Sequence, residues 1–146
     1  MLQLVCLNAA ATAACCWAAG LARRLSALPA GRWACSGWPI TVPASCTQFT
    51  INLTHAGKMP IAAMGHNLVV AKEADMAGIA ADGASNAAEH VKEGDARSIA
   101  HTKIIGGGES TSVTFDVAKI KDGGPFKFFC SFPGHLALMQ GSIQVQ

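Results

Sequence analysis

The segment Cys130–Met139 limits the possible folds of this chain, because it places three side chains that bind metals within ten residues. His135 follows Cys130 after five positions, and Met139 follows His135 after four. A thiolate and an imidazole are strong ligands for first-row metals, and a thioether is a weak, soft one. This mixture suits copper. Pro133 and the glycine after it favour a sharp turn, so we expect a loop that presents these side chains together.

A copper ion that changes its charge by one electron is typically held by two imidazoles, one thiolate and a weak axial sulfur. The loop is therefore one histidine short. The upstream sequence Met64-Gly65-His66-Asn67 offers the missing imidazole, and the fold must then bring two distant segments together. Two other functions use the same residues. One is a structural zinc site, and the other is a catalytic Cys–His pair, in which Met139 has no role.

The sequence beyond Ile40 predicts an all-β protein. Polar and apolar residues alternate in segments 48–53 and 112–117, as they do in half-buried strands. Segment 66–71 reads as a more fully buried strand, and segments 98–105, 126–130 and 142–146 as further strands. Glycine-rich turns separate several of them. We expect a Greek-key β-sandwich with one short helix, about Glu73–Ala81, in a long excursion.

These motifs resemble those of the azurins, bacterial blue-copper proteins of the cupredoxin family. The resemblance covers about Ile40–Gln146. It implies a type 1 copper protein that shuttles single electrons and is not an enzyme. The matching segments are Ile40-Thr-Val, Cys46-Thr-Gln-Phe-Thr-Ile-Asn-Leu, Met64-Gly-His-Asn, Ala74-Asp-Met, Ile99-Ala-His-Thr-Lys, Ser112-Val-Thr-Phe-Asp-Val and Phe128-Phe-Cys-Ser-Phe-Pro-Gly-His.

The resemblance also implies roles for the residues around one copper ion. His66, Cys130 and His135 would be equatorial ligands. Met139 would be a long axial ligand, and the carbonyl of Gly65 would face it from the opposite side.

Further residues are expected around these ligands. Asn67 and Phe132 would support them, with Asn67 tying the two ligand segments together by hydrogen bonds. His55 would lie near the copper without binding it, and His90 would be solvated. An apolar patch that docks partners would surround the exposed edge of His135 and include Met59, Met64, Pro133 and Ala137.

The resemblance implies c-type cytochromes or a reductase as partners, in the bacterial periplasm. The net charge of the chain is only +2, which gives no reason to propose nucleic acid or an acidic membrane as a partner. We expect no membrane attachment of the mature form.

The first 45 residues differ in composition from the rest. They contain three arginines, no acidic residue, all three tryptophans and four of the six cysteines. Residues 1–20 are apolar like a signal peptide, but no basic stretch precedes the apolar run. Residues 21–39 do not resemble the opening strands of an azurin, so we assign the copper-binding domain to residues 40–146. We favour a reading-frame error corrected near Ile40, with a divergent leader as the alternative. A damaged gene could yield a non-functional product.

The disulfide partner of Cys46 is uncertain. In azurins the cysteine at this place pairs with one near the mature amino terminus, as suits an oxidising periplasm. The equivalent upstream position of this chain has no cysteine, and Cys35 is the nearest substitute. Connectivity cannot be read from sequence alone.

We predict that the chain as written is less stable than one with an azurin-like opening strand and upstream cysteine restored. A sandwich that lacks its first strand leaves unpaired backbone groups at an edge, and losing a native disulfide costs about 2–5 kcal/mol. Thermal melting of the two copper-free proteins measures the difference. A melting point of the present chain equal to or above that of the restored one contradicts the prediction.

Overall fold

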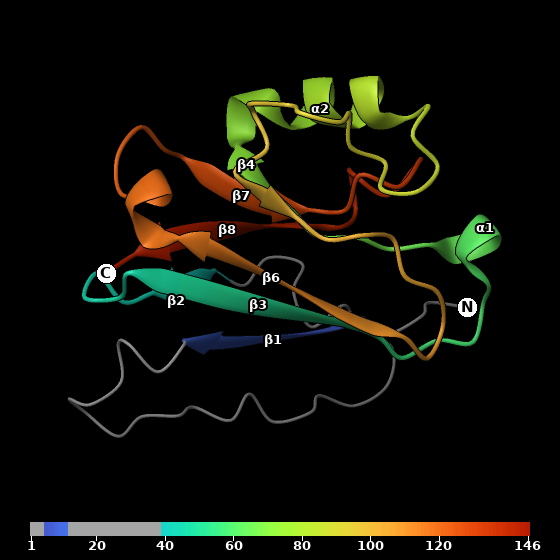
Figure 1. Cartoon of the computed structure of the whole chain (residues 1–146), viewed down its shortest axis with the longest axis horizontal. Coiled ribbons are helices and arrows are strands. Elements are labelled where there is room, and N and C mark those ends of the chain that lie inside the picture. Colours follow the sequence, from blue (N-terminus) through green and yellow to red (C-terminus); the bar gives the residue numbers. More distant parts are fainter. Residues whose placement is uncertain (1–4, 12–38) are drawn as a thin grey trace.

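The structure, a computed structural model, describes residues 5–11 and 39–146, and its strands form two sheets (Figure 1). The first sheet has three antiparallel strands in the order β1 (Val5–Ala11), β3 (Gln48–His55) and β6 (Ser110–Asp116). The second has five, in the order β2 (Ile40–Val42), β8 (Gln140–Val145), β7 (Phe126–Phe129), β4 (Val69–Lys72) and β5 (Ala100–His101). Within it only the β2–β8 pair is parallel. The expected all-β Greek-key sandwich is confirmed.

The main core lies between the two sheets, where buried apolar residues of β3, β6 and β8 meet. In β3 the alternation is strict, with Phe49, Ile51 and Leu53 buried and the residues between them more exposed. Phe49 is in register with Phe115 of β6, and the two rings meet edge to face with centroids 6.1 Å apart. Edge-to-face pairs of this kind add to the stabilisation that burial provides.

A second, smaller core lies on the outer face of the five-stranded sheet. Helix α2 (Met76–Gly83) covers this face above β4 and β7, as Figure 1 shows. Met76 and Ile79 of the helix pack there against Val69, Ala71 and other buried residues. Residues 69–71 of β4 are therefore buried on both faces of the sheet, which explains why they are all apolar and do not alternate with polar residues.

The remaining elements are short. A 3-10 turn, η1 (Glu73–Asp75), leads into α2, so the helical segment predicted at about residues 73–81 is confirmed. Two one-turn helices were not predicted, namely α1 (Ile61–Met64) and η2 (Val117–Ile120). Segment 98–105, predicted as a strand, pairs as β5 over two residues only, although further backbone hydrogen bonds fix the residues on either side of it.

Strand β1 was not predicted. Val5–Ala11 lies in the apolar run that we assigned to a leader, and it pairs with β3 from His55 to Phe49. We expected a missing first strand to leave unpaired backbone groups at a neighbouring edge, whereas in this structure β1 pairs with the edge of β3. The physical reason is that an edge strand has unpaired backbone N–H and C=O groups, which can form hydrogen bonds with any extended segment that reaches them. Cys35 and residues 12–38 lie outside the described residues, so the Cys46 disulfide remains a prediction.

We predict that Ile51→Ala lowers the free energy of unfolding by about 2–5 kcal/mol, because it removes buried methyl groups and leaves a cavity. Ile51 is fully buried in the core between the sheets. Urea unfolding of the copper-free protein measures the loss. The matched control is Thr114→Ala on the neighbouring strand, which removes one exposed hydroxyl pair with Thr50 and should cost about 1 kcal/mol or less. Equal losses in the two variants would contradict this account of the core.

Candidate metal centre

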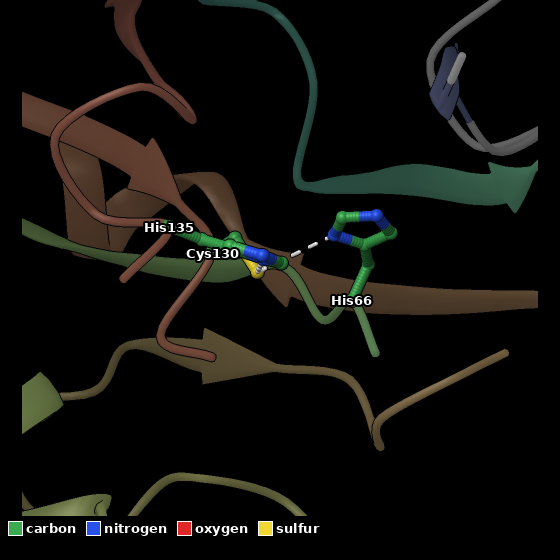
Figure 2. Close-up of side chains that lie close together, drawn as sticks. All are labelled: His66, Cys130 and His135. Atoms are coloured by element: carbon green, nitrogen blue, oxygen red, sulfur yellow. Dashed lines mark hydrogen bonds between the residues drawn. The ribbon is translucent and has the colours of Figure 1, made fainter. Parts of the chain in front are cut away.

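Three side chains converge at one end of the sandwich: His66, Cys130 and His135 (Figure 2). One ligand atom from each lies within 4.8 Å of the others. The sulfur of Cys130 lies 3.9 Å from Nδ1 of His66 and 3.6 Å from Nδ1 of His135. His66 and Cys130 are buried, and His135 is half-buried. Among the described residues this is the one group of three or more metal-binding side chains that lies close enough to share an ion.

The loop after β7 presents Cys130 and His135 through its own backbone hydrogen bonds. Cys130 N–H donates to the Met139 carbonyl (2.9 Å), and Met139 N–H donates to the His135 carbonyl (2.9 Å). His135 N–H in turn donates to the Phe132 carbonyl (3.0 Å). Gly134 has a φ of +82°, a conformation that side chains other than glycine rarely adopt. The predicted sharp turn is thus present, and the hydrogen bond between Cys130 and Met139 joins the two ends of the loop.

His66 reaches the site from the other segment. It forms an isolated antiparallel bridge with Ile105, with N–H···O distances of 3.0 and 2.8 Å in the two directions. Its ring lies 4.5 Å from the ring of His55, between centroids. His55 is fully buried, and both of its ring nitrogens are occupied. Gly57 N–H donates to Nδ1, and Nε2 donates to the Met64 carbonyl, so His55 lies beside the site without a free donor atom for a metal.

Asn67 ties the two segments together. Its side-chain oxygen accepts the Ser131 N–H at 2.9 Å, and its amide nitrogen donates to the Ser131 hydroxyl at 2.8 Å and to the Glu89 carbonyl at 2.7 Å. Asn67 and Ser131 are each 2% exposed. Asn67 directly follows His66 in the sequence, and Ser131 directly follows Cys130. These bonds therefore join the segment that carries His66 to the segment that carries Cys130.

Burial controls the charge of the three side chains. It raises the pKa of the Cys130 thiol to about 11, against the opposing effect of hydrogen bonds from the backbone of Asn67 and Phe132. Burial also lowers the pKa of His66 to about 3, helped by the charges of two neighbouring histidines, and burial lowers the pKa of His135. Both imidazoles are consequently neutral at pH 7, the form that binds metals. A metal cation would displace the thiol proton.

The distances fit one metal ion. Metal–nitrogen bonds of about 2.0 Å and metal–sulfur bonds of about 2.3 Å, at angles near tetrahedral or trigonal, place the donor atoms about 3.6 Å apart. The observed Sγ–Nδ1 distances of 3.6 and 3.9 Å agree with that separation. The residues present can therefore hold a metal with little rearrangement.

Two more of the predicted site residues lie next to this cluster. Met139 is buried and lines a small cavity together with Cys130 and Asn67. Gly65 is buried against the loop, and a Cβ there would lie 2.7 Å from the Ile104 side chain and 3.0 Å from the Phe132 ring. Only glycine leaves enough room at this position.

The predicted apolar patch overlaps an open hollow beside the cluster. Of the residues predicted near the metal, Phe132 and Pro133 line this hollow. Met59 and Ala137 are exposed, and Met64 is half-buried. Four further residues that were not predicted also line the hollow: Ile61, Ala62, Ala87 and His90. Pro60 directly precedes helix α1, and a proline at a helix start could have indicated the short helix that carries Ile61 and Ala62.

His90 differs from the expectation that it is solvated. Its ring packs edge-on against the ring of Phe132, with centroids 5.1 Å apart and planes at 74°. Its Nδ1 is buried and has no hydrogen-bond partner among the described residues. Nothing in the local sequence signals this contact, because His90 and Phe132 belong to segments that only the folded chain brings together.

The fold and the cluster define a class of protein: the chain belongs to the plastocyanin/azurin family of copper-binding proteins, whose sequence pattern matches residues 35–146. Curated proteins similar to it include azurins of several bacteria. It is 56% identical over 108 residues to the azurin of Alcaligenes faecalis, covering 73% of this chain and 84% of that protein. It is 57% identical over 106 residues to the azurin of Pseudomonas chlororaphis, covering 71% and 83%.

A solved structure is similar as well. The azurin of the obligate methylotroph Methylomonas sp. strain J superposes with a TM-score of 0.70 at 47% identity, covering 74% of this chain and 85% of that one. These matches confirm the resemblance and the cupredoxin fold. Together with the His–Cys–His cluster, they identify the chain as a blue copper electron-transfer protein with one copper ion.

We predict that Asn67→Ala lowers the free energy of unfolding of the copper-free protein by about 2–4 kcal/mol, because it leaves buried hydrogen-bonding groups of Ser131 and Glu89 without their partner. Urea unfolding gives the value. Asn52→Ala, on the half-exposed face of β3, is the control and should change stability by no more than about 0.5 kcal/mol. A loss no larger than that of the control would show that Asn67 does not hold the two segments together.

Proposed function

We propose that His66, Cys130 and His135 bind the copper ion through Nδ1, Sγ and Nδ1, and that Met139 supplies a weak axial contact opposite Gly65. The observation that carries the proposal is the convergence of three mostly buried donor atoms, within 4.8 Å, from segments far apart in sequence. An imidazole pair with one thiolate and a distant thioether is the donor set of blue-copper sites.

Zinc binds similar donors, so the donor atoms alone do not select the metal. Membership of a copper-binding family favours copper, and the buried Met139 beside Cys130 gives the soft sulfur that a blue-copper site uses. Nucleophilic catalysis by Cys130 is disfavoured, because burial keeps the thiol protonated at neutral pH and its pKa is about 11. We propose that the chain carries electrons and catalyses no reaction of its own.

Copper, when bound, supplies a one-electron couple. The chain's part is to hold the donor atoms in one arrangement, so that little rearrangement accompanies the change of charge. The Asn67 hydrogen bonds fix the spacing of the two segments. Backbone N–H groups of Asn67 and Phe132 hydrogen-bond to the Cys130 sulfur and would stabilise negative charge on it.

Electrons would pass through the half-buried edge of His135, in the apolar surface beside it. Ile61, Phe132 and Pro133 line the hollow, and the large side chains of Met59, Ile61 and Leu138 are 43%, 42% and 74% exposed. Exposed apolar area of this kind marks surfaces that contact other proteins. We propose that redox partners dock here, and that c-type cytochromes or a reductase of the bacterial periplasm are the partners. None of the helices in the described part of the chain combines the length and the apolar character that a membrane span needs.

We predict that Cys130→Ser abolishes the intense visible absorption that appears when copper is added, because a hydroxyl cannot replace the copper–thiolate bond. Absorption spectroscopy of the refolded, copper-loaded protein measures this. The matched control is Cys46→Ser, which also changes a buried cysteine and should leave the protein blue. A Cys130→Ser variant as blue as the unchanged chain would refute the ligand assignment.

We predict that Met139→Leu stays blue and shifts the reduction potential, because a weak axial ligand tunes a copper site more than it holds the ion. Voltammetry of the loaded protein gives the potential. Met76→Leu, a buried methionine in the outer core, should leave the potential unchanged. Loss of copper from the Met139 variant, with copper retained by the Met76 variant, would count against an axial role.

A further inference from the structure

Five rings lie in a row that starts in the core and ends at the hollow beside the metal centre. The order is His55, His66, His135, Phe132 and His90. Successive centroids are 4.5, 4.9, 4.8 and 5.1 Å apart. The first four rings belong to the site or its immediate support. The fifth comes from the loop between α2 and β5 and is not among the residues proposed above to bind copper.

The backbone of His90 is held tightly from several sides. Its N–H donates to the Asn86 carbonyl at 2.7 Å, and its carbonyl accepts the Ser131 hydroxyl at 2.6 Å. Gly83 of helix α2 packs directly on the same carbonyl, where a Cβ would collide. The loop around His90 is therefore docked on the copper-binding segment and not merely adjacent to it.

His90 also adopts an uncommon conformation. Its φ is +49°, and in the described chain it is the one residue other than glycine with a positive φ. Glycine and asparagine adopt this conformation more readily than most residues, and either would close the turn. A histidine at this position adds a ring, and that ring packs edge-on against Phe132.

We propose that His90 is a positioning residue, whose ring holds Phe132 against His135 and so keeps water away from the metal centre. The proposal rests on the ligand assignment made above. The geometry supports it, because Phe132 contacts both rings: its centroid lies 4.8 Å from that of His135 and 5.1 Å from that of His90. Edge-to-face contact with a second ring restricts the orientations open to Phe132.

The proposed role has a direct consequence for the reduction potential. Phe132 and Pro133 line the hollow next to His90, so a mobile Phe132 ring would admit water towards His135. The apolar shell of a metal site controls solvent access and local dielectric, and hence the potential. A more polar surrounding favours the oxidised form, which carries the higher charge. Loss of the His90 ring should therefore lower the potential.

The test compares His90→Asn with His90→Phe. Asparagine suits the positive φ but removes the ring, whereas phenylalanine keeps a ring edge and removes both ring nitrogens. The control is His101→Asn, which changes a half-buried histidine whose ring contacts Ser98 and Glu89. A cooperative unfolding transition in urea shows that each variant is folded. If His90→Asn is not folded, His90→Gly takes its place.

The first measurement uses the copper-free protein, so that it does not depend on metal binding. Proton NMR records the magnetisation transfer between the ring protons of Phe132 and His135. We expect this transfer to weaken in His90→Asn and to persist in His90→Phe and in the control. Unchanged transfer in His90→Asn overturns the proposal, whatever the metal does.

The second measurement is the potential of the copper-loaded protein. We expect His90→Asn to lower it by an amount equal to about a threefold change in the ratio of the Cu(II) and Cu(I) binding constants, roughly 28 mV for one electron. His90→Phe should restore most of the shift. A potential unchanged in His90→Asn, or lowered equally in His90→Phe, overturns the positioning role. If the chain without any substitution does not turn blue when copper is added, the ligand assignment itself is refuted.

Discussion

The antiparallel pairing of β4 with β7, locked by the Asn67–Ser131 hydrogen bonds, is the constraint on which the rest of this structure depends. It places the residues before one strand beside the residues after the other. His66 and Cys130, distant in the chain, thereby become neighbours before any metal is bound. Because the carbonyls of Glu89 and His90 accept hydrogen bonds from Asn67 and Ser131, the loop beyond α2 belongs to the same rigid unit.

Burial of this unit determines the protonation states of the side chains that surround the metal centre. It leaves the thiol protonated and the imidazoles neutral in the copper-free chain, so the site carries no uncompensated charge in the core before copper binds. A buried charge without a partner would be strongly unfavourable. In the proposed ligand arrangement, copper would add charge where the backbone N–H groups of Asn67 and Phe132 already hydrogen-bond to the Cys130 sulfur, and the donor atoms would need little movement.

Much of the fold followed from local patterns. The strict alternation in segment 48–53 predicted β3, and the spacing of Cys130, His135 and Met139 pointed to a copper loop that the structure brings together with His66. Features that depend on contacts between segments were missed. Strand β1 forms because the edge of β3 is open to pairing, and helix α1 is a single turn too short to show a periodicity. A long strand was expected over residues 98–105, but only the two residues of β5 pair as a strand.

The sequence by itself determined which donor atoms are available, in what order they occur, and that a β-sandwich must bring them together. Those properties lie in residue type and spacing, which are local. The tertiary structure decided how far apart the donors lie, which protonation states they hold and which residues surround them. His90 illustrates the reason: its contact with Phe132 joins two loops with no shared pattern, and only the packing of α2 and the copper-binding loop on one sheet creates it.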